Sequence, residues 1–244
     1  MKSKLLLTLI MFAPAIHADD SGFTATLQGC TELIGLGPVP LSVVRPLVPS
    51  TFVIPEFGPG TAGLVVRVGQ CQALSTSGTA ARPVNVGQIG VAIVSPDGSG
   101  DINNYTLFYT TSDDRLARAL QDAGLPAALD PVLAYEFTPN LSGELYAAVA
   151  PFGAPAWFVS GSAADTPLGG PAPVTANWWF QTKRGTLKMA TVIPSIQYVI
   201  AGFTLHTSKV SPLGQIIGGN TDSSFPFFNA RGLFSTGVMS VSSR

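Results

Sequence analysis

The chain has 244 residues, of which 46% are hydrophobic and only 11% are charged, and its formal net charge is −1. Its basic residues form no run longer than the pair Lys183-Arg184. Because binding to a phosphate backbone needs clustered positive charge, we do not expect nucleic acid as a partner. A hydrophobic chain of this length can bury a large core and is expected to form one domain.

The first residues are typical of a secretory signal. Two lysines precede an apolar stretch (residues 5–16), and Ala18 offers a small residue at the expected cut. The stretch is shorter than the roughly 20 residues that cross a bilayer, although an uncleaved membrane anchor is the alternative. We therefore expect a signal peptide over residues 1–18 and a mature domain over residues 19–244, exported to a periplasm or the cell exterior and without stable membrane insertion. That domain keeps 11 basic and 14 acidic residues, a formal charge of −3.

The chain has two cysteines, Cys30 and Cys71. In an exported chain this number predicts one disulfide. It would close a loop of about 42 residues and stabilise the fold by about 4 kcal/mol in the chain-entropy model. A reactive thiol is the alternative, but neither cysteine has a basic or histidine neighbour in sequence to stabilise a thiolate.

Most segments alternate between apolar and polar residues with a period of two and end at Gly, Pro, Ser or Asn, which predicts strands joined by turns. The expected strands are 63–74, 86–94, 105–110, 132–138, 144–150, 157–160, 177–182, 185–193, 196–208 and 232–241. Residues 75–85 and 161–175 read as loops. About ten strands favour a mainly β (α+β) fold, built as a large antiparallel barrel or sandwich with helices packed on it.

One helix is expected after Ser112, a good N-cap that is followed by two aspartates at the positive end of the helix dipole. Leucines and alanines then recur at helical spacing until Gly124, and Pro126 prevents continuation. A second short helix is expected over residues 212–217, where Gly218 and Gly219 follow.

Several segments together resemble the acetoacetate decarboxylase-like family. The first segment is Arg-Pro-Leu-Val-Pro (residues 45–49), and an expected strand follows at 62–68. Further on, a strand and a short helix lead to Gly124-Leu125-Pro126. The tracts 178–189 and 201–208 are similar to that family's closing strands. The resemblance implies a curved, cone-like antiparallel β-barrel, with one or two short helices, around a closed cavity.

The resemblance fails at the residues that carry the family's chemistry. Where the decarboxylases have two lysines after the proline, this chain has Ala127 and Ala128. In that family a desolvated lysine forms a Schiff base with a β-keto acid, and neither alanine can form an imine. Of the remaining lysines, Lys188 lies in a strand-like tract and either faces solvent or points into the cavity.

Two charged residues in apolar strands are candidate catalytic groups. Glu136 lies between aromatic residues and either faces water or is buried with a partner. Inside the barrel it would act as a general acid or base with a pKa raised by desolvation. Arg67 would clamp a carboxylate bidentately; the alternatives are an ordinary arginine on the strand face or a structural pair with Glu136.

Three further residues are candidates for lining the ligand cavity. Arg45 would lie at the barrel mouth or only mark a loop, and one indole of the pair Trp178-Trp179 would face the cavity, for which Trp179 is our choice. His206, the only histidine after the signal peptide, either lines the pocket or is a surface or hydrogen-bonded structural residue. A serine hydrolase would need it as base, but no G-x-S-x-G elbow is present. With one histidine and two cysteines we expect no zinc site, and no cofactor.

Three functions remain open. The first is an exported barrel that binds a small organic molecule and has lost the Schiff-base lysine. The second is a lyase or decarboxylase-like enzyme acting on a keto acid or cyclic metabolite through Glu136 and Arg67. The third is a structural envelope protein. The sequence leaves open whether the chain forms homo-oligomers.

Overall fold

The structure is a computed structural model that describes residues 22–138 and 143–243. The expected signal peptide and its cleavage site lie outside the described residues. The described elements, in chain order, are β1 (Phe23–Pro40), α1 (Leu41–Val44), η1 (Arg45–Leu47), β2 (Thr61–Thr76), β3 (Arg82–Ala92), β4 (Ile102–Thr111), α2 (Asp114–Asp122), β5 (Ala128–Leu129), β6 (Ala134–Thr138), β7 (Glu144–Val149), β8 (Trp157–Pro167), β9 (Ala172–Thr182), β10 (Gly185–Thr207), α3 (Pro212–Ile216), β11 (Asp222–Ser224) and β12 (Phe228–Ser243).

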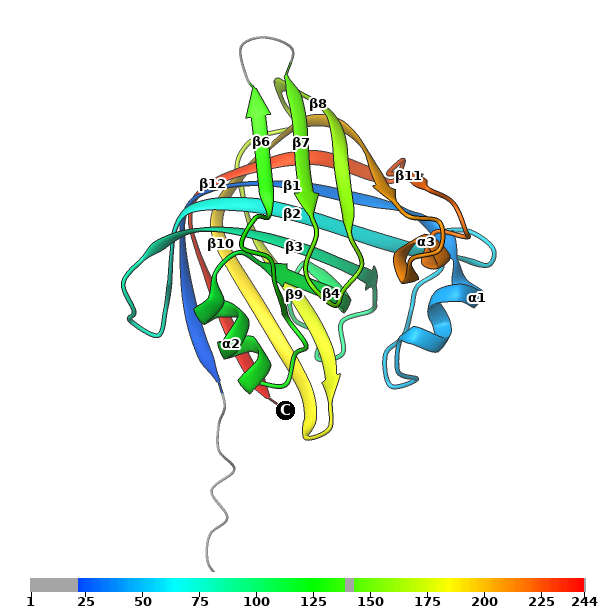
Figure 1. The fold of residues 1–244 in the computed structure, drawn as a ribbon, viewed down its shortest axis with the longest axis horizontal. Coiled ribbons are helices and arrows are strands. Elements are labelled where there is room, and N and C mark those ends of the chain that lie inside the picture. The colour runs from blue at the N-terminus through cyan, green and yellow to red at the C-terminus, as the bar shows by residue number, and fades with distance from the viewer. Residues whose placement is uncertain (1–21, 139–142, 244) are drawn as a thin grey trace, which may run out of the picture.

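The strands form one sheet that curves into a ring (Figure 1). Its hydrogen-bonded order is β12-β1-β2-β3-β4-β9-β10, and β12 pairs with β10 to close the ring. The mainly β, barrel-like fold class expected from the sequence is therefore confirmed. All neighbours are antiparallel except at β4, which runs parallel to β9 and to the short β5.

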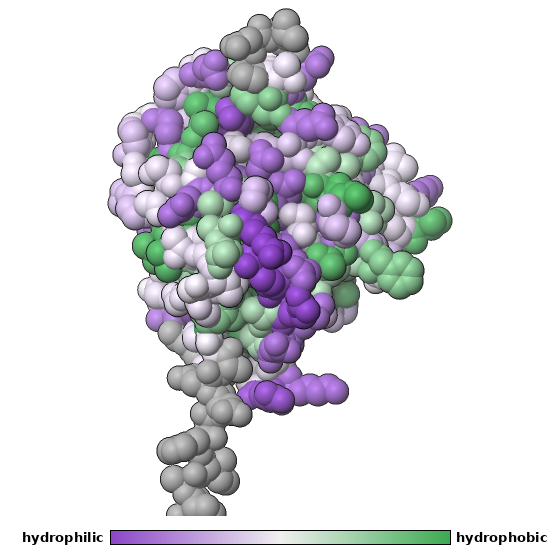
Figure 2. Space-filling model, turned by 60° about the vertical axis from the view of Figure 1, so that its left-hand side comes forward, coloured by the Kyte–Doolittle hydropathy of each residue, from purple (hydrophilic) through white to green (hydrophobic). Residues whose placement is uncertain are grey.

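A second layer continues from β10 through β8, β7 and β6 and lies across the outside of the ring (Figure 1). The hydrophobic core is consequently divided in two. One cluster fills the inside of the ring and includes Leu116 and Leu120 of α2, which covers one end. The other lies between the ring and the outer layer and includes Val44 of α1 and Leu213 of α3. The outward side of α2 forms a hydrophilic strip near the middle of the face shown in Figure 2.

Several local expectations need correction. β1 was not expected as a strand, and the expected loop 161–175 is largely occupied by the extended ends of β8 and β9. The expected strands 185–193 and 196–208 are one continuous strand, β10. The N-cap of α2 is Asp113 rather than Ser112, because the Asp113 carboxylate accepts hydrogen bonds from the backbone N–H groups of Arg115 and Leu116.

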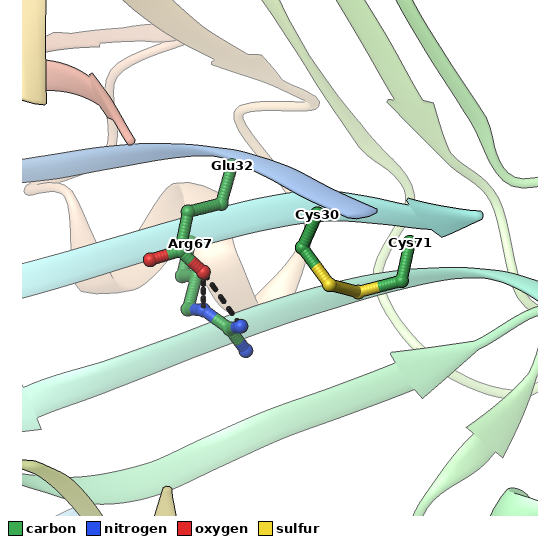
Figure 3. Close-up of a disulfide and its surroundings, with 4 residues drawn as sticks. All are labelled: Cys30, Glu32, Arg67 and Cys71. Carbon is green, nitrogen blue, oxygen red and sulfur yellow. Dashed lines mark hydrogen bonds and ion pairs between the residues drawn. A yellow bond between two sulfur atoms is a disulfide. The ribbon is translucent and has the colours of Figure 1, made fainter. Parts of the chain in front are cut away.

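The expected disulfide joins Cys30 and Cys71, which lie directly opposite each other on β1 and β2 (Figure 3). None of the described helices is long and apolar enough to cross a membrane. Among the described residues there is also no group of three or more His, Cys, Asp or Glu side chains that could hold a metal ion.

We predict that replacing both cysteines by alanine lowers the free energy of unfolding by about 2–4 kcal/mol, because the disulfide then no longer closes a loop across a sequence separation of 41 in the unfolded chain. Urea unfolding curves of the oxidised wild type and of the Cys30→Ala/Cys71→Ala variant measure the difference. As a control, a reductant should shift the wild type toward the variant and leave the variant unchanged. Coincident curves would mean that the disulfide contributes nothing to stability.

Candidate functional site

A buried ion pair lies inside the ring (Figure 3). The Oε2 atom of Glu32, on β1, accepts hydrogen bonds from Nε of Arg67 at 2.7 Å and lies 2.6 Å from its Nη2. Nη1 of Arg67, on β2, also donates to Oε1 of Gln88 on β3 at 2.5 Å. The side chain of Glu32 is only 4% exposed, and that of Arg67 is 16% exposed. Three neighbouring strands therefore share one charged group in the barrel interior.

The local sequence leaves space for the Glu32 side chain. Glu32 pairs with Gly69 on β2 and with Gly232 on β12. A Cβ atom at Gly69 would lie 3.0 Å from Cβ of Glu32, and one at Gly232 would lie 3.4 Å from its Cγ. Because neither neighbour has a side chain, the carboxylate can reach diagonally along the sheet to Arg67.

The surroundings of the ion pair shift several pKa values. Burial lowers the pKa of Arg67, but the adjacent Glu32 carboxylate outweighs this effect and holds it above the ordinary guanidinium value, so Arg67 stays charged. Burial raises the pKa of Tyr109 to about 12, although the charge of Arg67 opposes the shift. Burial, helped by Glu32, likewise raises the pKa of Tyr198 to about 12. Both phenols are therefore neutral at ordinary pH.

Little space remains around this group. Two cavities touch the ion pair, one of about 40 Å³ that is also lined by Trp178 and Tyr198, and one of about 20 Å³ that is also lined by Tyr109. A water molecule needs about 10–15 Å³ on this scale, whereas ligand pockets measure about 300–1,000 Å³. These two cavities at the ion pair are therefore large enough for a few water molecules and too small for the ligand expected inside the barrel.

Glu136 faces solvent, which is one of the two orientations expected from the sequence. On β6, Tyr135 and Phe137 point at the outside of the ring, where the Tyr135 hydroxyl lies 3.1 Å from Oγ1 of Thr31 and the Phe137 ring lies 3.7 Å from the guanidinium carbon of Arg231. Since side chains alternate along a strand, Glu136 between them is exposed. The structural partner that we considered for Arg67 is accordingly Glu32 and not Glu136.

The other expected cavity residues do not face the ring interior. Arg45 is exposed on η1. Trp178 rather than Trp179 lines the larger interior cavity. Trp179 belongs to the outer hydrophobic cluster, and its Nε1 donates to Oδ1 of Asn103 at 2.9 Å.

Lys188 is buried, so the solvent-facing orientation that the sequence allowed is wrong. Its side chain nevertheless does not point into the ring. It lies between Leu187 and Met189, which point into the interior cluster, and so its own side chain points outward. There its Nζ lies 2.8 Å from Oδ2 of Asp97, bonds to Ser99 and lies 4.9 Å from the ring centre of Trp179. Burial raises the pKa of Asp97, but hydrogen bonds from Lys188 and Ser99 outweigh it and hold this pKa well below its ordinary value.

His206 lies on the outer face of β10, in the layer that covers the ring. Its Nε2 lies 2.9 Å from Oγ of Ser160 and its Nδ1 lies 2.6 Å from Oδ1 of Asp222. The ring stacks on Phe158, with the centroids 4.5 Å apart. These contacts hold the His206 ring in one orientation, on the outer layer rather than inside the ring.

The ligand-sized space that borders β4 is a groove of about 570 Å³ between this strand, the end of β9 and the short helices α1, η1 and α3. β4 and β9 are paired only as far as Tyr105 and Trp179. Beyond this point the groove lies between Thr106–Phe108 of β4 and Phe180 of β9. We call it the β4–β9 groove; its lining residues are Val43, Leu47, Tyr105, Thr106, Leu107, Phe108, Phe180, Pro212, Gln215 and Ile216.

The β4–β9 groove has an aromatic wall and one unsatisfied polar group. The rings of Tyr105 and Phe180 stack with their centroids 6.0 Å apart. Thr106 is 1% exposed, and its Oγ1 has no hydrogen-bond partner in the described chain. Buried polar atoms are nearly always hydrogen-bonded, so the unpaired Thr106 hydroxyl beside the groove is unusual. None of the residues that line the groove is charged.

The fold resembles solved structures of acetoacetate decarboxylase and related enzymes. An acetoacetate decarboxylase superposes with a TM-score of 0.58 at 8% identity, over 90% of this chain and 87% of that one. An acetoacetate decarboxylase-like enzyme from Sphingomonas wittichii RW1 gives 0.54 at 9% identity, over 95% of each chain. The enduracididine biosynthesis enzyme MppR, complexed with pyruvate, gives 0.53 at 10% identity, over 94% of this chain and 91% of that one. No family model and no curated protein matches the sequence.

These likenesses establish the acetoacetate decarboxylase-like fold that the short sequence motifs suggested. At such low identities they establish the fold alone, because one fold can carry many different sites.

The free energy of unfolding at alkaline pH tests whether these tyrosines are buried. A phenol whose pKa rises from 10.0 to about 12 on folding, as for Tyr109, stabilises the native state fully below pH 10. That contribution, about 2–3 kcal/mol, is lost as the pH rises from about 10 to 12. Urea unfolding at pH 8, 10 and 11 should show the decline, and the Tyr109→Phe variant should show a smaller one. Absorbance at 295 nm in which every tyrosine titrates near pH 10 would contradict the buried arrangement.

Proposed function

We propose that the protein is an exported small-molecule-binding protein built on the acetoacetate decarboxylase-like fold, without Schiff-base chemistry, and that its ligand binds in the β4–β9 groove. The observation that carries the proposal is the contrast between a filled barrel interior and an aromatic groove of about 570 Å³ with an orphan hydroxyl. Export is supported by the lysine-led apolar N-terminal stretch and by the disulfide, since disulfides persist in oxidising compartments.

The loss of imine chemistry is supported by the positions of the lysines. Ala127 lies in the interior cluster at the place where the family motif has lysine. Lys183 and Lys209 are exposed, and Lys188 is held by Asp97 on the outer face of β10. None of these three is among the residues that line the two interior cavities. A decarboxylase of this type needs a desolvated amine that faces its substrate.

The lining of the β4–β9 groove defines the class of ligand. Its residues carry no charge, and all but Thr106 and Gln215 are apolar or aromatic, so we expect a neutral, largely apolar molecule. The stacked rings of Tyr105 and Phe180 favour a planar one. Thr106 could give or accept one hydrogen bond, which favours a ligand with a single carbonyl, hydroxyl or N–H group at one edge.

The lyase proposed from sequence gains no support from the site. Glu136 is exposed and Arg67 is engaged by Glu32 and Gln88, so the two residues do not form a common site.

We predict that borohydride traps no substrate on this protein. The mature chain is incubated with acetoacetate or pyruvate, reduced, denatured and weighed by mass spectrometry. Its mass should equal that of the untreated chain, because no lysine faces the interior cavities. A lysine adduct that survives denaturation would contradict the proposed loss of imine chemistry.

We predict that N-phenyl-1-naphthylamine, a neutral planar amine with one N–H group, becomes fluorescent on binding to the β4–β9 groove. Thr106→Val should weaken binding about 10-fold, since it removes one buried hydrogen bond worth about 1–2 kcal/mol. Phe180→Ala should weaken it further by removing half of the aromatic wall.

Two controls separate the groove from other sites. Phe152→Ala removes a fully exposed aromatic ring elsewhere and should leave the dissociation constant unchanged. Tyr198→Phe alters the interior cavity and should also leave it unchanged. Binding that is lost in Tyr198→Phe but retained in Phe180→Ala would place the ligand inside the barrel. Binding that no variant changes would remove the support for the groove.

A further inference from the structure

Three side chains on the outer face of the second layer form a hydrogen-bonded chain. Oγ of Ser160, on β8, lies 2.9 Å from Nε2 of His206 on β10, and Nδ1 of His206 lies 2.6 Å from Oδ1 of Asp222 on β11. This is the order of groups that turns a serine into a nucleophile, namely hydroxyl, imidazole and carboxylate.

The register of the strands brings the three groups together. Ser160 pairs with Thr204, two residues before His206, and His206 pairs with Asp222. Directly paired residues of antiparallel strands point to the same face, as do residues two apart on one strand. The contact between Ser160 and His206 is therefore a diagonal one across the sheet, and that between His206 and Asp222 is a direct one.

The hydrogen bonds assign the tautomer of the histidine. An ionised carboxylate can only accept a hydrogen bond, so the proton of the neutral imidazole lies on Nδ1, which donates to Asp222. Nε2 then carries a lone pair and accepts the hydrogen bond from the Ser160 hydroxyl. Stacking on Phe158, at an interplanar angle of 20°, holds the imidazole in this orientation.

The chain of hydrogen bonds borders an open groove of about 480 Å³. His206 and Asp222 line it together with Tyr146, Ala148 and Phe158. The rings of Tyr146 and Phe158 lie 6.0 Å apart, and both are partly exposed. An aromatic group could therefore rest on these rings beside His206, and Tyr146 is the residue of β7 that pairs with Ser160.

We propose that Ser160 is a nucleophile that takes an acyl group from small esters of phenols, with His206 as its base and Asp222 as a positioning residue. Oγ of Ser160 bonds to the carbonyl carbon while its proton passes to Nε2 of His206. The bond from that carbon to the phenol oxygen then breaks, and the proton from His206 goes to the leaving oxygen. Water, deprotonated in the same way, adds to the acyl-serine and releases the carboxylic acid and free Ser160.

The surroundings restrict the substrate to activated esters. β8 is hydrogen-bonded to β7 on one side and to β10 on the other, so the backbone N–H groups near Ser160 are engaged in the sheet. Stabilisation of the oxyanion then depends on side-chain donors such as the hydroxyl of Thr204, which pairs with Ser160. Esters with a good leaving group react even when the oxyanion is only weakly stabilised, whereas amides do not.

The test uses the mature chain and two probes, 4-nitrophenyl acetate for turnover and an alkyl fluorophosphonate for covalent capture. We expect one fluorophosphonate label per chain, mapped to Ser160 by peptide mass spectrometry. Ser160→Ala should abolish the label and His206→Gln should slow it at least 100-fold. Ser162→Ala, which removes the next hydroxyl on the same face of β8, should leave the rate unchanged.

Asp222 is tested by a conservative pair of variants. Asp222→Asn should slow labelling at least 10-fold, because an amide does not fix the proton on Nδ1, whereas Asp222→Glu should restore part of the rate. A purely structural role would not separate the two variants. Circular dichroism confirms that each variant is folded. A wild type that stays unlabelled, or a label on Tyr146, Ser162 or a lysine that persists in Ser160→Ala, would overturn the proposal.

Discussion

Closure of the ring around a charged pair is the constraint on which the rest of the structure depends. Because β12 bonds to both β1 and β10, every inward side chain of the ring must share one enclosed space. Glu32 and Arg67 occupy the middle of that space, and a buried charge is tolerable only with a partner. The glycines beside Glu32, the amide of Gln88 and the neutral tyrosines around the pair all serve to satisfy or accommodate it.

This arrangement is one reason why we do not propose for this chain the chemistry of the enzymes that its fold resembles. Around the Glu32–Arg67 pair, the two cavities have space for a few water molecules but not for a metabolite. Sites for other molecules then have to lie outside the ring. The β4–β9 groove arises where two strands of the ring lose their pairing, and the Ser160–His206–Asp222 chain lies on the added outer layer. We therefore propose that function lies in the parts that surround the barrel.

The sequence predicts those features that depend on neighbouring residues and misses those that depend on strand order. The period-two pattern identified most strands, and the cap and stop signals identified α2. β1 was missed because its many glycines read as breaks, although Gly35 is needed there, since a Cβ atom would lie 2.5 Å from the ring of Phe225. β10 was divided in two at Pro194, which the strand accommodates in an irregularity of its pairing with β9.

The site residues show the same limit. Arg67 was recognised as a charge that needs an acid, but its partner could be named only once β1 was known to lie beside β2. His206 was recognised as a candidate base, yet its serine and its acid are 46 and 16 residues away, and no motif signals that β8, β10 and β11 are neighbours. The β4–β9 groove was not foreseen, because it depends on where β4 and β9 stop pairing, which no local pattern signals.

The central claim is that a ligand binds outside the ring while the interior stays filled. The most direct measurement is a crystal structure of the protein purified from its own compartment with its natural ligand retained. The account predicts density for a planar organic molecule between Tyr105, Phe180 and Thr106, with Glu32 and Arg67 still paired and only water beside them. An organic molecule inside the ring that displaces the Glu32–Arg67 pair would contradict it.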